Sequence, residues 1–308
     1  MTACSRLDEI MDSVIVAIPN DEALAAELGK KGSQNGITYY NRKAGEAAVV
    51  IMAPSDAVSK FYAVAEIMSI ADVAIISTSN TDALLGESII IASMLGKKTI
   101  FTKENDISGI LKSVSIKECE FSERKELVEK LGTFKRDQSS RAEELRIDID
   151  KSFPVKGVGT VLLGIVRSGT VNVHDSLKSS GGKDISVRSI QVHDEDQQQA
   201  GPGDRVGIAA KGIDYTEVEK GDVLSKEKKP YVASISADVK KSQMLKDLEL
   251  DGLSCTLVSG FLAVNCRLTK AGETFSIKLE KPSALWKGDR FLLIREKSPK
   301  AVGAGSVI

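Results

Sequence analysis

The sequence predicts a small doubly wound α/β domain followed by antiparallel β-barrels. Up to about residue 132 of the 308-residue chain, short apolar runs alternate with segments of helical periodicity. Continuous apolar strands separated by amphipathic helices indicate a parallel sheet that is covered on both faces. From Ile147 onward helical periodicity is nearly lost and short β-rich runs are broken by glycines, which is typical of antiparallel barrels.

The α/β part is predicted element by element from this alternation. The apolar runs that we expect to be strands are SVIVAI (13–18), AAVVIMA (47–53), DVAIIST (72–78) and KTIFT (98–102). Helical periodicity covers the segments 21–30, 58–69, 82–95 and 107–112. Asn20 is expected to cap the first helix, because Asn is favoured at that position. A polar, charged stretch from Lys135 to Arg146 ends the pattern, so we place a domain boundary there.

Composition predicts a soluble, multidomain protein. With 308 residues, of which 42% are hydrophobic, the chain can form two or three domains that each bury a core. The apolar runs fall well short of the ~18 residues of a membrane span and no signal-peptide pattern is present, so we expect a cytoplasmic protein without membrane contact. We also expect a monomer. The spacing of the four cysteines, which include no CxxC pair, predicts neither a structural zinc site nor a disulfide framework.

Charge is distributed unevenly along the chain. The net charge is −1, yet residues 229–308 contain 13 Lys and Arg against 8 Asp and Glu. An excess of this size permits contact with RNA through neutralisation of phosphates, without demanding it. An ordinary solvated surface is the alternative explanation.

Two stretches of the barrel region carry a specific combination of motifs. They are VKGVGTVLLGIVRSGTVNVHDSL, from Val155 to Leu177, and VRSIQVHDEDQQQAGPGDRVGIAAKGIDYTEVEKGDVLS, from Val187 to Ser225. Within them GxGTV, SGT, GDRVG and GDVL follow in the order, and close to the spacing, of the second domain of the elongation factor Tu superfamily. The final AVGAGSVI (301–308) resembles, more loosely, the closing strand of that superfamily's third domain.

The chain therefore resembles a translational GTPase, and within the superfamily it is most similar to the selenocysteine-specific elongation factors of archaea and bacteria. The resemblance implies a P-loop-type α/β domain in residues 1–140, then two antiparallel β-barrels in residues 146–228 and 229–308. The 308 residues do not include the large extra C-terminal domain of the selenocysteine-specific factors.

The first domain lacks the loop with which such proteins hold the phosphates of GTP. A P-loop needs GxxxxGK(S/T) after the first strand, because its backbone N–H groups wrap the phosphates while its lysine meets them. Here the first strand is followed by Pro19, Asn20, Asp21 and Glu22. Proline removes one donor, and carboxylates in the first helical turn repel an incoming phosphate.

The motif on the magnesium side of the nucleotide is changed as well. Where the family has DxPG and then His, this sequence reads Met52, Ala53, Pro54, Ser55 and Asp56. A thioether thus replaces the carboxylate beside the magnesium, the glycine at the γ-phosphate has gained a side chain, and an Asp stands where a residue would position the attacking water.

The motif that selects guanine is the third to differ. Where the family has (N/T)KxD, the sequence reads Thr102, Lys103, Glu104 and Asn105, and an Asn cannot offer the two acceptors of an Asp. Because three sites with one shared purpose have changed, we expect a degenerate, nucleotide-incompetent G domain that serves as a scaffold and binds neither GTP nor magnesium. An unconventional nucleotide site is the alternative.

The resemblance also implies a pocket in the first barrel for the aminoacyl end of a tRNA. Transferred position by position, the family's acidic pair before a Phe falls on Asp150 and Lys151, with the Phe at Phe153. The pocket aromatic falls on His193 and the polar residue of the GDRVG turn on Arg205. Selenocysteine-specific factors have Asp, His and Arg at three of these places, so Lys151 departs from their pattern. The charged residues could hold an α-amino group and an ester, or could equally form a surface ion-pair cluster.

Three hypotheses follow for function. The leading one is a GTPase-like protein without nucleotide that binds tRNA, other RNA or ribosomal components through its barrels. The second is a divergent GTPase acting in elongation, which the missing lysine and glycines disfavour because phosphoryl transfer depends on such positioning and charge. The third is a protein that regulates a genuine elongation factor.

Overall fold

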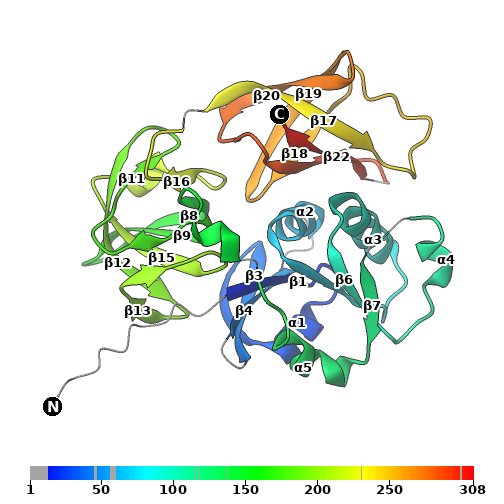
Figure 1. The fold of residues 1–308 in the computed structure, drawn as a ribbon, viewed down its shortest axis with the longest axis horizontal. Coiled ribbons are helices and arrows are strands. Elements are labelled where there is room, and N and C mark those ends of the chain that lie inside the picture. Colours follow the sequence, from blue (N-terminus) through cyan, green and yellow to red (C-terminus); the bar gives the residue numbers. More distant parts are fainter. Residues whose placement is uncertain are drawn as a thin grey trace.

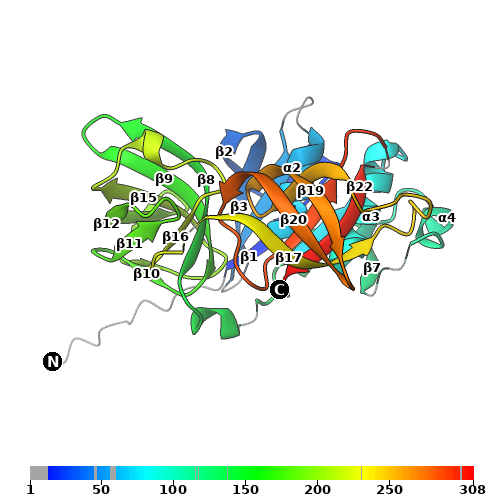
Figure 2. The ribbon, with the colours of Figure 1, turned by 90° about the horizontal axis from the view of Figure 1, so that it is seen from above.

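The computed structural model describes residues 13–44, 47–55, 60–114, 116, 118–136, 138–229, 231–298 and 300–308. An α/β domain is followed by two β-rich domains, as the sequence predicts (Figure 1). The third domain lies along one face of the α/β domain, above α2 and α3, and the second domain lies at the end of both (Figures 1 and 2).

A seven-stranded sheet forms the centre of the α/β domain. Its strand order is β2-β3-β4-β1-β5-β6-β7, in which the β2–β3 and β3–β4 pairs are antiparallel and the other pairs are parallel. The strands are β1 (Ser13–Ala17), β2 (Lys30–Asn35), β3 (Ile37–Ala44), β4 (Ala47–Pro54), β5 (Val73–Ile76), β6 (Lys98–Thr102) and β7 (Cys119–Ser122). The four apolar runs of the sequence are β1, β4, β5 and β6, which lie side by side in the parallel part.

Helices cover both faces of this sheet, which confirms the doubly wound prediction. They are α1 (Glu22–Leu28), α2 (Lys60–Ile70), α3 (Ala83–Leu95), α4 (Ser108–Leu111) and α5 (Leu127–Leu131). Buried residues of α2 and α3 pack on one face, and those of α1 and α5 pack on the other. Alternate strand residues such as Ile15 and Val16 enter opposite cores, because side chains of a strand point to opposite faces in turn.

The second domain is a sheet of seven strands in the order β11-β16-β8-β9-β15-β12-β13, and pairing of β11 with β12 joins its two sides. A two-stranded sheet of β10 and β14 lies beside it. The strands are β8 (Arg146–Val155), β9 (Gly159–Ser168), β10 (Val171–Asn172), β11 (Ser176–Ser179), β12 (Asp184–Val192), β13 (Glu195–Gln197), β14 (Gln199–Ala200), β15 (Arg205–Lys211) and β16 (Val223–Ser225).

The third domain is a closed antiparallel barrel in the order β17-β20-β19-β18-β21-β22. Its strands are β17 (Val232–Lys241), β18 (Ser254–Ser259), β19 (Leu262–Ala271), β20 (Thr274–Ser283), β21 (Arg290–Ile294) and β22 (Ala301–Val307). Phe291 and Leu257 fill its interior.

The three domains share buried surface. The core beneath α2 and α3 continues into the barrels through Ile165 of β9 and through Val258, Phe261 and Leu292 of the third domain. A contiguous apolar core across domains favours one fixed arrangement, because separation would expose it to water. Among the described residues, no helix has both the length and the apolar character of a membrane span.

Candidate functional site

Ligands of open α/β sheets bind at the carboxyl ends of the parallel strands, so this edge is the first candidate site. The segment between β1 and α1 is only four residues long, from Ile18 to Asp21. Asp21, not Asn20 as predicted, caps α1: its carboxylate accepts a hydrogen bond from the Leu24 N–H at 2.9 Å. The charged side chain of Asp21 satisfies a free amide of the first turn, where an anion would otherwise bind.

Asn20 connects two strands instead. Its Nδ2 donates to the Ser77 carbonyl at 2.7 Å and its Oδ1 accepts from the Ser77 N–H at 3.1 Å. Both hydrogen-bonding groups of the amide are therefore used within the sheet edge, and Pro19 beside it is buried.

The ends of β5 and β6 are joined in the same way. The Thr78 N–H donates to Thr102 Oγ1 at 2.7 Å, and the Thr78 hydroxyl donates to the Thr102 carbonyl at 2.9 Å. The Asn105 amide donates to the carbonyls of Thr78 at 2.7 Å and Ser79 at 3.0 Å. Thr102 and Asn105, two of the four residues at the guanine-selecting position, thus use their polar groups on the segment that follows β5.

Arg124 spans this edge, and sequence reasoning missed it. It begins the 3₁₀ turn after β7, and its guanidinium donates to Glu104 at 2.8 Å, to Glu27 at 3.1 Å and to Asp21. Burial raises the pKa of Glu104, but hydrogen bonds from Thr102 and Arg124 outweigh that effect and lower it overall. One arginine therefore holds together three carboxylates, which belong to the loop after β1, to α1 and to the loop after β6.

The remaining residues of the predicted nucleotide site do not converge. Met52 is fully buried in the core beneath α2, and Pro54 ends β4 opposite Ile37. The Ser55 N–H donates to the Gly36 carbonyl at 3.0 Å, and Lys103 is exposed. Asp56 lies outside the described residues.

The second candidate site is where the second domain meets the β2–β3 hairpin. Asp150 and Arg205 form an ion pair at 3.0 Å, with side chains 0% and 10% exposed. Tyr39 of β3 covers the pair: its hydroxyl donates to Asp150 at 3.0 Å and its ring lies 3.3 Å from the guanidinium carbon of Arg205. Arg205 also donates to Ser33 Oγ at 3.0 Å. The structure thus brings together two of the three charged residues predicted for the pocket, Asp150 and Arg205, but it places them in a contact between domains and not at a surface.

Lys151 is separated from this pair. The pairing of β8 with β9 is irregular between Ile149 and Lys151, so that Asp150 turns inward and Lys151 is exposed. The Lys151 ammonium lies 5.7 Å from the ring of the half-buried Phe153. The sequence alone could not show this, because a bulge changes which face each residue occupies.

His193 lies beside Arg205 at a small cavity of about 110 Å³ between the hairpin and the barrel, which Asn41 and Gln191 also line. Several buried polar atoms here have no hydrogen-bond partner among the described residues: Asn41 Oδ1, Asp150 Oδ1, Arg205 Nη1 and both ring nitrogens of His193. Burial lowers the pKa of the His193 imidazole. Neither ring nitrogen of His193 therefore caps a backbone carbonyl among the described residues.

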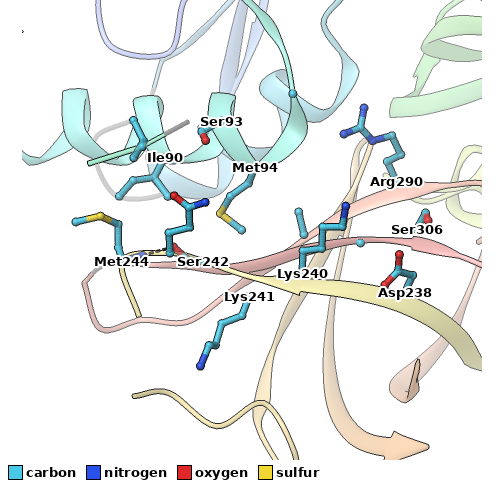
Figure 3. A pocket seen from close by; sticks show the side chains of 15 residues that line it. Ile90, Ser93, Met94, Asp238, Lys240, Lys241, Ser242, Met244, Arg290 and Ser306 are labelled. Atoms are coloured by element: carbon cyan, nitrogen blue, oxygen red, sulfur yellow. Dashed lines mark hydrogen bonds between the residues drawn. The ribbon is translucent and has the colours of Figure 1, made fainter. Parts of the chain in front are cut away.

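A third feature is a depression of about 410 Å³ between α3 and the third domain (Figure 3). On the α3 side it is lined by Ile90 and Met94, and on the barrel side by Lys240 and Arg290. Both cations extend toward α3 (Figure 3), and Arg290 donates to the Leu95 carbonyl. An adjacent depression adds further cations; the basic surface formed in this way comprises Lys112, Lys240, Lys241, Lys246 and Arg290.

Comparisons with known proteins agree with this architecture. Residues 159–225 match the family model of elongation factor Tu domain 2. The uncharacterized protein MJ0325 of Methanocaldococcus jannaschii is 30% identical over 89% of this chain and 92% of its own length. Elongation factor 1-alpha of Methanoregula boonei is 31% identical over 44% of this chain, which spans only 32% of that protein.

Among solved structures, the chain is similar to translation elongation factor SelB from Methanococcus maripaludis in complex with the GTP analogue GPPNHP. The two share a TM-score of 0.81 and 20% identity over 97% of this chain and 79% of that one. At this identity the likeness concerns the fold. Taken with the domain 2 match and the relatives above, it shows that the chain belongs to the translational GTPase superfamily of elongation factor Tu type.

Proposed function

We propose that this chain is an elongation factor-like protein that has lost the GTP site and binds tRNA, other RNA or ribosomal components through its barrels. The observation that supports the loss of the GTP site, the first half of this proposal, is the group of Asp21, Glu27 and Glu104 around Arg124. Three carboxylates against one guanidinium leave a negative excess where a nucleotide would bring its phosphates and base. No lysine of a P-loop is present to offset it.

Isothermal titration with GTP and with GDP, each with magnesium at millimolar concentration, tests this half. We expect no heat of binding, while an archaeal elongation factor 1-alpha measured alongside gives a clear isotherm. A dissociation constant in the low micromolar range would overturn the proposal and favour the divergent GTPase.

The basic surface supports the second half, because exposed cations around a depression can neutralise phosphates of RNA. Filter binding of total tRNA at several salt concentrations tests it. In Lys240→Ala with Lys246→Ala, affinity should fall and the slope of log K against log salt should lose about one unit per contact removed. The matched control replaces two exposed lysines of the first domain, Lys103 and Lys125, by Ala. Equal losses in both double variants would show that this surface is not where RNA binds.

Within the same proposal, the cavity at His193 and Arg205 receives the aminoacyl group. Its 110 Å³ is far below the ~300 Å³ at which pockets begin to hold drug-sized ligands, so a small side chain fits there and an adenosine does not. His193→Ala should then weaken binding of aminoacylated tRNA by about 1–2 kcal/mol and leave tRNA without its terminal adenosine unchanged. The same loss for both tRNAs would remove the aminoacyl role.

A further inference from the structure

A pair of thiols lies within the third-domain barrel, although the sequence spacing gave no reason to expect a disulfide. Cys255 of β18 and Cys266 of β19 are direct partners across the antiparallel ladder. Their sulfur atoms are 3.7 Å apart, and the residues are 9% and 5% exposed. Cα atoms of directly opposed residues lie about 4.5–5.5 Å apart, within the ~4.4–6.8 Å that a disulfide requires.

We propose that Cys255 and Cys266 are a redox-active pair that closes to a cross-strand disulfide when a peroxide oxidises it. The backbone already holds the two residues at a suitable separation, so closure needs only small side-chain rotations. By contrast, Cys119 is exposed on β7 and belongs to the first domain.

A small oxidant can reach the pair. Both cysteines line a depression of about 720 Å³, which is also bordered by Tyr62 and Arg267. Both cysteines also belong to the apolar core of the barrel, together with Leu257 and Leu268. An uncharged molecule the size of hydrogen peroxide fits such a depression, whereas access for a folded protein reductant is restricted.

A thiolate is the attacking species in this reaction. The hydrogen bond between the two thiols lowers the pKa of Cys266 and so favours Cys266 as that thiolate. Its sulfur attacks one oxygen of hydrogen peroxide, the O–O bond breaks, and the leaving hydroxide takes a proton to become water. The Cys255 sulfur then attacks the resulting sulfenic acid, loses its proton and releases a second water. Two electrons pass from the thiols to the peroxide, and one S–S bond is formed.

The location of the pair gives the bond a consequence for the whole molecule. The β18–β19 hairpin ends in Gly260, whose N–H donates to Ser69 Oγ of α2 at 3.0 Å, and Phe261 enters the core shared with the first domain. A disulfide between residues 11 apart would restrict the unfolded chain and fix this hairpin. Oxidation would thus strengthen one of the elements through which the third domain contacts the first.

The experiment uses the full chain with Cys119→Ser and with Cys4→Ser, the latter outside the described residues, so that only the pair is left. After hydrogen peroxide the protein is unfolded, alkylated and analysed by peptide mass spectrometry. We expect both thiols to resist alkylation, their peptides to be joined within one molecule, and dithiothreitol to restore them. The equilibrium constant of unfolding in urea should fall about a hundredfold on oxidation, as loop closure of this length implies.

Two results would overturn the proposal. One is full alkylation of both cysteines after a peroxide dose that oxidises the exposed Cys119 of the unaltered protein. The other is cross-linking between molecules only, seen as dimers on non-reducing electrophoresis. Cys266→Ser serves as the control, in which no intramolecular link forms. If this variant is unstable, the number of free thiols in the unaltered protein before and after peroxide shows whether the pair has closed.

Discussion

The ion pair between Asp150 and Arg205 lends itself to a quantitative test, because Tyr39 of the first domain covers it and both side chains are largely buried. Asp150→Asn keeps the shape of the side chain and removes its charge, which leaves the guanidinium of Arg205 with Ser33 and the ring of Tyr39 as its remaining partners. Loss of one partner from a buried pair costs about 3–5 kcal/mol. Since Arg205 keeps a 10% exposed side chain and the Ser33 contact, we expect a loss near the lower limit, about 3 kcal/mol.

The assay is urea unfolding followed by circular dichroism at constant salt. Asp184→Asn is a matched control in the same domain: its partner is Lys178, but its side chain is 81% exposed, so its loss should stay below about 1 kcal/mol. A difference of less than about 1 kcal/mol between the two variants would refute the reasoning that the pair stabilises the contact between the first and second domains.

Three further expectations rest on single residues and are also read from unfolding curves. Gly260→Ala should lower the free energy of unfolding by about 2 kcal/mol or more, because φ is +58° and an added Cβ would lie 2.6 Å from an Asp148 carboxylate oxygen. The control Gly272→Ala has a similar φ of +65° but open space around it, so it should lower the free energy of unfolding by only about 1 kcal/mol. Equal losses in the two variants would exclude the steric cause. Burial lowers the pKa of Lys97 to about 7, so between about pH 7 and 10 the Lys97 amine is protonated in the unfolded chain but not in the folded protein, and stability should rise with pH. Lys97→Met should flatten that rise. An unchanged pH profile in this variant would contradict the assignment to Lys97. Arg124→Ala should lower stability by about 1 kcal/mol, since the side chain is 31% exposed, without creating GTP binding; heat of GTP binding in this variant would show that the arginine alone blocks the site.

Much of the architecture followed from local pattern. The four apolar runs became the parallel strands, because a strand buried on both faces must be apolar along its whole length. The β2–β3 hairpin was not expected, since β2 reads KKGSQN, is exposed throughout and has no hydrophobic period. Its pairing with β3 comes from backbone hydrogen bonds at the sheet edge, which leave little trace in side-chain composition.

Departures from the nucleotide motifs were likewise visible in the sequence, because those motifs are contiguous and each depends on residue type at fixed spacing. The chain by itself therefore determined the domain classes and the absence of a P-loop. It could not show that Arg124 would meet Asp21, or that Tyr39 would cover Asp150, since these residues are 103 and 111 positions apart. Likewise the Cys255–Cys266 contact depends on strand register. Such partners are chosen by the long-range packing of sheets and domains, and only the tertiary structure decides which polar group ends up beside which.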